Sequence, residues 1–141
     1  MSDLHYLPAT EALRLFRSRE LSPVELVSAV IERAEAVEPV INAFAETFFD
    51  EAMAAARAAE ARYAGNGAPP RPLDGLPVAV KEEAEIAGQR NTLGSLPLRD
   101  VIAEKTTVFV QRIIDAGGIV HARTTTPESA AHRSPGPGCG A

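Results

Sequence analysis

A turn leads into a short apolar run that ends in a lysine in the segment Leu73-Asp74-Gly75-Leu76-Pro77-Val78-Ala79-Val80-Lys81-Glu82. Asp74-Gly75 is a turn signal, and proline is tolerated at the first residue of a strand but not in its middle, so a strand is predicted to begin near Pro77. The unbroken apolar residues before Lys81 favour a strand covered on both faces in a parallel or mixed sheet. Lys81 is then the first polar residue at the carboxyl end of this strand, the edge at which open α/β sheets bind ligands.

Two interpretations of Lys81 differ in the state of its amine. In the first, the aliphatic stem follows the sheet edge, and the ammonium reaches water or pairs with Glu82, Glu83 or Glu85. In the second, the amine is desolvated, loses its proton and serves as a general base. The strand alone favours the first interpretation, so the surrounding sequence has to be weighed as well.

The whole segment from Leu73 to Glu82 resembles the catalytic-lysine segment of the amidase signature family, L-x-G-x-P-x-x-V-K-D, with glutamate in place of the usual final aspartate. Two further blocks follow at family-like spacing. The first block, at 87–95, resembles the family's A-G-x-x-T-x-G-S loop through Ala87-Gly88 and Asn91-Thr92-Leu93-Gly94-Ser95. Ala116 to Val120 and Thr124 to Glu128 resemble its A-G-A-x-x-x-G-K-T-N-x-P-E segment. The resemblance covers residues 8 to 128 and then ends.

The resemblance implies an α/β fold in one partial amidase domain over residues 1–128. A helical arm at about residues 9–38 would precede the start of an α/β core at about 41–128, a mixed sheet covered by helices. The implied chemistry is hydrolysis of a small-molecule amide to a carboxylic acid and ammonia or amine, without a cofactor. In the family, a neutral lysine takes a proton from a bridging serine, which activates a nucleophilic serine. Lys81 would be that base.

By the same resemblance, Thr92, Gly94 and Ser95 are candidates for lining the substrate site. The alternative is a polar turn in which Gly94 supplies a positive φ angle, and both interpretations stay open. Ser95 is not favoured as a nucleophile, because the family takes its nucleophile from elsewhere. His121 is expected to be a strand side chain rather than a catalytic group. Arg123 stands where the family usually has a lysine, and because that lysine is not the catalytic one, the change puts little of the resemblance in doubt.

The glycine- and serine-rich segment that carries both catalytic serines in the family follows the Pro-Glu block, and no counterpart is recognised here. Residues 129–141 diverge and are expected to form a disordered tail. We therefore expect an N-terminal fragment of an amidase-type hydrolase, inactive by itself. Two alternatives remain: the A subunit of a glutamyl-tRNA amidotransferase, and a truncated, non-catalytic product that folds or binds a partner through its helical arm.

The composition excludes several other classes. The chain has 141 residues, 45% of them hydrophobic, and a net charge of −5, which argues against binding nucleic acid or anionic membranes through bulk electrostatics. No apolar run approaches the roughly 20 residues of a membrane span, and the start lacks signal-peptide features, so a cytoplasmic protein is expected. Cys139 has no cysteine partner and His5, His121 and His132 lie far apart in sequence, so no metal site is expected. A homodimer is compatible with these properties.

Local signals predict the remaining elements. Ala12, Leu13 and Phe16 lie at helical spacing in a helix at about 9–19, and Ser22-Pro23-Val24-Glu25 is a capping box for a helix at about 23–37, with Pro39 marking its end. The other predicted elements are a strand at 41–47, a helix at about 49–64, a helix capped by Thr106 or Thr107 that ends at Gly117-Gly118, a strand at 119–122 and a helix from Thr126-Pro127-Glu128. A strand, helix and strand at this spacing favour a parallel pair.

Overall fold

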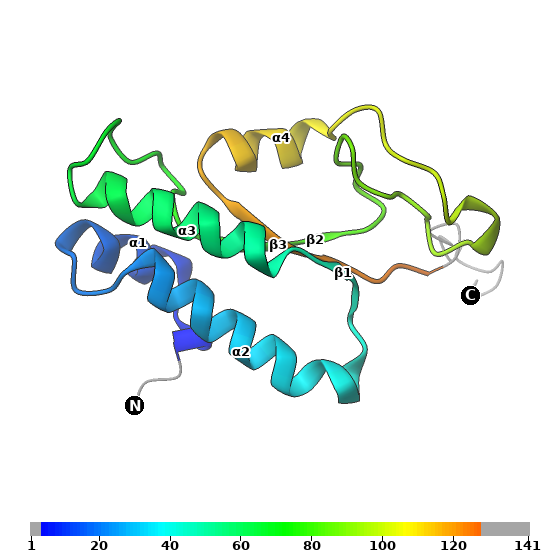
Figure 1. The fold of residues 1–141 in the computed structure, drawn as a ribbon, viewed down its shortest axis with the longest axis horizontal. Helices are drawn as coiled ribbons and strands as arrows, with labels where there is room; N and C mark the ends of the chain where they lie inside the picture. The colour runs from blue at the N-terminus through cyan, green and yellow to red at the C-terminus, as the bar shows by residue number, and fades with distance from the viewer. Residues whose placement is uncertain (1–3, 128–141) are drawn as a thin grey trace, which may run out of the picture.

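A computed structural model describes residues 4–127 of the chain (Figure 1). Its elements are α1 (Ala9–Ser18), α2 (Pro23–Ile41), β1 (Phe44–Thr47), α3 (Phe49–Tyr63), β2 (Pro77–Lys81), α4 (Val108–Asp115) and β3 (Ile119–Thr124), with short 3-10 helices at Leu4–Tyr6 and Leu96–Leu98. The predicted α/β class is confirmed. The predicted tail at 129–141 and the helix predicted from Thr126-Pro127-Glu128 onward lie outside the described residues.

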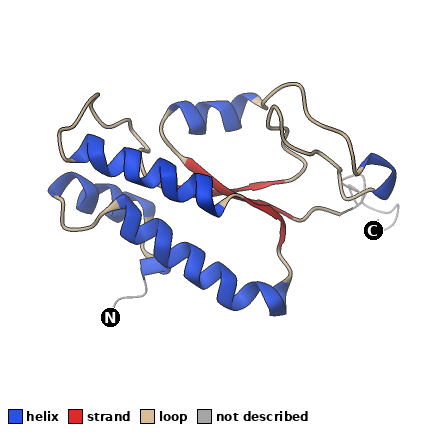
Figure 2. Ribbon diagram, in the orientation of Figure 1, coloured by secondary structure: helices blue, strands red, loops and turns tan. Residues whose placement is uncertain are grey.

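The described strands form one mixed sheet in the order β1-β3-β2, drawn in red in Figure 2. β2 and β3 run parallel, with Pro77 opposite Ile119 and Lys81 opposite Thr124, which confirms the predicted parallel pair. β1 runs antiparallel to β3. The central strand of the three is therefore β3, and the strand that carries Lys81 lies at the edge.

Helices pack on both faces of this sheet (Figure 1). On one face, Val27 of α2 and two alanines of α3 pack against Ile119 of β3. On the other face, Val110 of α4 packs with Val80 of β2. The expectation that β2 is covered on both faces is wrong for its second half, because Ala79 and Lys81 are exposed. The reason is the strand order: the central strand β3, rather than β2, receives α3.

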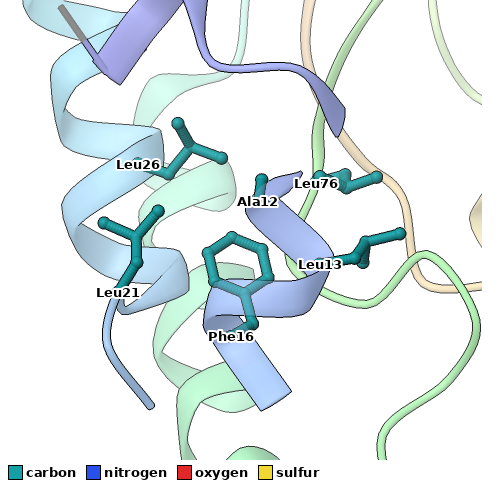
Figure 3. Packing of buried hydrophobic residues seen from close by; sticks show 6 residues of the cluster. All are labelled: Ala12, Leu13, Phe16, Leu21, Leu26 and Leu76. Carbon is teal, nitrogen blue, oxygen red and sulfur yellow. The ribbon is translucent and has the colours of Figure 1, made fainter. Parts of the chain in front are cut away.

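The helical arm has its own apolar core, shown in Figure 3. The side chains predicted to face inward on α1 are buried, which confirms the helical pattern. They pack against residues of the α1–α2 connection, of α2 and of the turn before β2; the cluster consists of Ala12, Leu13, Phe16, Leu21, Leu26 and Leu76. Since Leu76 directly precedes β2, this core connects the arm to the strand that carries Lys81.

The predicted capping box at the start of α2 is present. The Ser22 hydroxyl accepts a hydrogen bond from the Val24 amide at 2.9 Å, and the Glu25 carboxylate accepts one from the Ser22 amide at 2.8 Å. The predicted end at about residue 37 is too early, because α2 continues past Pro39 to Ile41. Pro39 removes one backbone hydrogen bond of the helix, and contacts of Glu38 with the residues after α2 stabilise the last turn.

β1 starts later than predicted, at Phe44 rather than Ile41, because Ile41 is still helical. Asn42 takes the left-handed conformation after α2 and donates its amide to the Glu38 carbonyl at 2.8 Å. The Glu38 carboxylate then accepts the amides of Ala43 and Phe44 at 3.1 and 2.8 Å. The end of α2 therefore fixes the start of the strand.

The N-cap residue of α4 is Thr107, one of the two threonines predicted for this position. Its hydroxyl, however, accepts no hydrogen bond from the first turn of the helix. Instead it accepts the Glu85 amide at 2.9 Å, and the Thr106 hydroxyl accepts the Ala87 amide at 3.0 Å. The two threonines thus hold the chain that follows β2 against the start of α4. Gly117, with φ of 102°, follows the end of the helix as predicted.

The turn before β2 is built around Asp74, whose side chain is completely buried. Its carboxylate accepts two hydrogen bonds from the Arg62 guanidinium, at 2.5 and 2.7 Å, and one from that of Arg71 at 3.0 Å. Its carbonyl accepts the Tyr63 hydroxyl at 3.0 Å. The sequence predicts the turn but not this ion-pair cluster, which fastens the end of α3 to the start of β2.

Gly75 completes the turn, with φ of 89°. An added Cβ would lie 2.8 Å from the side chain of Pro23 in α2, closer than such carbons approach. Gly65 has a nearly identical φ of 85° but nothing within 4 Å of the same position. Of these two glycines, Gly75 therefore combines a left-handed backbone with close packing, and Gly65 does not.

Gly75→Ala is expected to destabilise the protein more than Gly65→Ala. Both variants place alanine in the left-handed region, at a cost of about 1–2 kcal/mol. Gly75→Ala should cost about 1–3 kcal/mol more, because the Cβ is forced against Pro23. Denaturant unfolding of both variants measures the difference, and equal losses would show that contact with α2 does not restrict Gly75.

Candidate active site

Lys81 ends β2 with its side chain directed away from α4 and 48% exposed. Its ammonium lies 3.3 Å from a carboxylate oxygen of Glu83. Within the described residues, Lys81 therefore has the arrangement of the first interpretation, an exposed lysine paired with a nearby glutamate. Its assignment as a general base stays a prediction.

Glu82, the next residue, turns inward and is 5% exposed. One of its carboxylate oxygens accepts the Thr92 amide at 2.7 Å and also the Thr92 hydroxyl. The Thr92 hydroxyl accepts the Gly94 amide at 3.2 Å. Glu82 thus connects the end of β2 to the loop that contains Thr92, Gly94 and Ser95. From the sequence, Glu82 was noted only as the residue at the position of the family's usual aspartate.

The three predicted lining residues Thr92, Gly94 and Ser95 lie together along an open pocket of about 290 Å³. Glu82 and the Thr125-Thr126 pair after β3 also line it, and Lys81 does not. Gly94 has φ of 68°, so the turn interpretation of this loop is confirmed. A role for these residues in binding substrate remains a prediction.

Arg123 of β3 is completely buried. Its guanidinium donates to the Glu82 carbonyl at 2.9 Å, to the Ala84 carbonyl and to the side-chain oxygen of Gln89 at 3.0 Å. Burial lowers the pKa of Arg123, although an arginine keeps its proton in proteins. The Arg123 side chain therefore holds the segment that follows Lys81, a structural role that the sequence analysis did not predict. A charged residue at the end of an apolar strand was the available signal.

His121 lies in β3 with 6% exposure, which confirms its assignment as a strand side chain. The Phe44 ring meets it edge-on with 6.0 Å between centroids, and the Phe49 ring stacks on it at 6.4 Å. Its Nδ1 atom has no hydrogen-bond partner within residues 4–127. Burial lowers the pKa of His121, because the charged imidazolium would lose its hydration.

Stability is expected to fall as the pH decreases through the unfolded-state pKa of His121, about 6.5. Below that pH the unfolded chain binds a proton that the folded protein excludes, so protonation favours unfolding. The slope from this group should reach at most about 1.4 kcal/mol per pH unit. Denaturant titrations at pH 7.5 and 5.5 of the wild type and His121→Phe, which keeps the ring contacts, measure it. An identical slope in both proteins would rule out His121 as the cause.

Within residues 4–127, no helix is both long enough and apolar enough to cross a membrane. The same part of the chain holds no group of three or more His, Cys, Asp or Glu residues that could bind a metal ion. Cys139 and His132 lie outside the described residues.

Comparisons with known proteins identify relatives over most of the chain. The sequence model of the Amidase family matches residues 25–136. An acylamidase of Rhodococcus erythropolis is 39% identical over 128 residues, covering 90% of this chain and 26% of the relative. The A subunit of the glutamyl-tRNA(Gln) amidotransferase of Carboxydothermus hydrogenoformans is 34% identical over 128 residues, covering 91% and 26%.

Solved structures agree with these matches. The structure of a bacterial aryl acylamidase of the amidase signature enzymes family superposes with a TM-score of 0.80 at 28% identity, covering 89% of this chain and 26% of that one. The chain thus spans about a quarter of the length of the relatives it matches.

Proposed function

Because the chain belongs to the amidase signature family, we propose that it forms the lysine-bearing part of a hydrolase that cleaves carbon–nitrogen bonds of amides. The products would be a carboxylic acid and ammonia or an amine. The observation that carries the proposal is the position of Lys81 at the carboxyl end of β2, within the segment that resembles the family's catalytic-lysine segment. Glu82 and the hydroxyl-bearing loop beside it add a polar pocket at the same sheet edge.

In the proposed mechanism, the neutral amine of Lys81 takes a proton from a bridging serine. That serine in turn takes the proton of a nucleophilic serine, whose oxygen attacks the amide carbonyl. The tetrahedral intermediate collapses when the leaving nitrogen receives a proton, and water then hydrolyses the acyl-enzyme. The serines would belong to polypeptide other than residues 4–127 and would approach the exposed face of β2.

The exposure of Lys81 in the described residues is compatible with this mechanism. Ala79 and Lys81 lie on the face of β2 that α4 does not cover. A segment that covers this face would remove water from the ammonium and compete with Glu83 for it. Desolvation disfavours the charged form of an amine, and the neutral form is the one that accepts a proton.

A second candidate function is ammonia release from glutamine, as part of the A subunit of a glutamyl-tRNA amidotransferase. The 34% identity to such a protein over 91% of this chain favours it. The same lysine would serve as the base, so the two candidates differ in substrate rather than in the chemistry at Lys81.

A third candidate is a non-catalytic product that folds or binds a partner through its helical arm. The exposed position of Lys81 beside Glu83 supports it, because this arrangement is typical of a surface lysine. All three candidates predict no hydrolysis by the 141-residue protein alone, because none is expected without the family's serines, so a chimera that supplies these serines has to separate them.

A chimera with the Rhodococcus erythropolis acylamidase tests the proposed function. Residues 1–128 of this chain would replace the matching part of that enzyme, and release of ammonia or amine would be measured with carboxamides, anilides and glutamine. We expect turnover of the carboxamides or anilides. Turnover of glutamine alone would favour the amidotransferase candidate. A folded chimera that hydrolyses none of the three would contradict a catalytic role for this segment.

A further inference from the structure

Arg123 and Lys81 lie on opposite faces of the sheet. Arg123 is the register partner of Val80, and Val80 faces α4. Paired residues of neighbouring strands share a face, and successive residues of one strand alternate, so Lys81 faces the other way. Arg123 therefore does not contact the Lys81 side chain and can act on it only through the backbone.

The guanidinium acts on that backbone directly after Lys81. One terminal nitrogen donates to the carbonyls of Glu82 and Ala84, and the other donates to the Gln89 side chain. The Ala84 amide in turn donates to the Lys81 carbonyl at 3.0 Å, which closes a tight turn. The direction in which the chain leaves β2 is thus fixed from the buried side.

Arginine and lysine differ at such a site. The planar guanidinium of arginine carries two terminal nitrogens. One reaches the carbonyls of Glu82 and Ala84 in the turn, while the other reaches the side chain of Gln89 further along the chain. A lysine carries its three N–H donors on one nitrogen, which cannot occupy the positions of both guanidinium nitrogens, so it can bind the two carbonyls but not Gln89 as well. A lysine at this position should therefore keep the turn in place and release the loop around Gln89.

We propose that Arg123 is a positioning residue for Lys81. Its guanidinium holds the turn at Glu82–Ala84, and this turn fixes where the Lys81 side chain leaves the sheet. Glu82, oriented by the same turn, holds Thr92 and thereby the loop that lines the pocket. The importance of Lys81 rests on the proposed function, whereas the restraint on the turn does not.

Amide hydrogen exchange of the 141-residue protein tests the restraint without any assay of activity. In Arg123→Met, the amides of Ala84 and Thr92 should exchange at least about tenfold faster than in the wild type, while amides of α2 and α3 keep their rates. In Arg123→Lys, the Ala84 amide should stay protected. Arg33→Met, which removes an exposed arginine of α2, is the matched control and should change neither amide.

Arg123→Met leaves buried carbonyls without a donor and can fail to fold. Gln89→Leu then takes its place, because it removes one of the three contacts and leaves the other two. It should speed exchange at Thr92 and spare Ala84. The positioning role is excluded if Ala84 and Thr92 exchange at wild-type rates in Arg123→Met, if Thr92 exchanges at the wild-type rate in Gln89→Leu, or if all amides of the protein accelerate equally.

Kinetics of the acylamidase chimera provide the functional readout. Misplacement of a catalytic group by about 1 Å can cost about 100-fold, so Arg123→Met should lower kcat by about that factor and leave KM within about twofold. Arg123→Lys should restore kcat to within about threefold, because one nitrogen suffices for the turn. An equal loss in both variants, or a loss confined to KM, would overturn the proposal. If Lys81→Met retains activity, the proposed function fails, and the exchange experiment still decides the restraint.

Discussion

Replacing Lys81 with methionine in the acylamidase chimera is expected to lower kcat for amide hydrolysis by about 10³-fold. Methionine has a similar length but cannot take the proton of the bridging serine, and general base catalysis contributes about 10²–10⁴-fold. Because the lysine and the two serines of the mechanism act as a unit, loss of one of them removes most of the rate enhancement. Ammonia release at saturating substrate measures the loss.

The same replacement should leave stability nearly unchanged. The Lys81 side chain is 48% exposed and its partner Glu83 is 42% exposed, and a pair of this kind contributes little in water. Lys105, an exposed lysine on the loop before α4, is the matched control, and Lys105→Met should retain full activity. Full activity of Lys81→Met would remove Lys81 from the mechanism and favour the interpretation as an exposed surface lysine.

Replacing Asp74 with alanine is expected to lower the free energy of unfolding by about 3–5 kcal/mol, the range for breaking a buried ion pair by removing one partner. The carboxylate is completely buried, and two guanidinium groups converge on it. Without it, Arg62 and Arg71 lose their common acceptor beside the start of β2. Denaturant unfolding measures the change, with Asp100→Asn as a control, because the Asp100 side chain is 86% exposed.

The effect of Asp74 should depend on pH in a defined direction. Burial acts to raise the pKa of Asp74, but the hydrogen bonds from Arg62 and Arg71 outweigh it, and the net effect is a lowered pKa. The unfolded chain therefore takes up the proton first. The stabilisation is complete above the unfolded-state pKa of about 4 and decreases as the pH falls below it, through the folded-state pKa. The free energies of unfolding of the wild type and Asp74→Asn are compared from pH 7 to pH 2. A difference that stays constant over this range would show that the Asp74 carboxylate is not the cause of the pH dependence.

Signals within a few residues of one another predicted much of the fold. The start of β2 at Pro77, the capping box at Ser22 and the buried face of α1 follow from proline geometry, side-chain capping and helical spacing, and all three are confirmed. The errors at the end of α2 and the start of β1 occur where two local preferences compete. Pro39 favours a helix end, but hydrogen bonds from Asn42, Ala43 and Phe44 to Glu38 stabilise one further half-turn, and the extension of α2 then delays the start of β1.

For the candidate site, the sequence by itself identified Lys81, the loop from Thr92 to Ser95 and the family in which such segments occur. Only the tertiary structure decided that β3 is the central strand, that Glu82 points inward and that Arg123 holds the turn after Lys81. The physical reason is the distance along the chain between partners. Arg123 and Glu82 are 41 positions apart, and whether a charged side chain is buried depends on whether distant segments supply enough hydrogen-bonding groups to replace water.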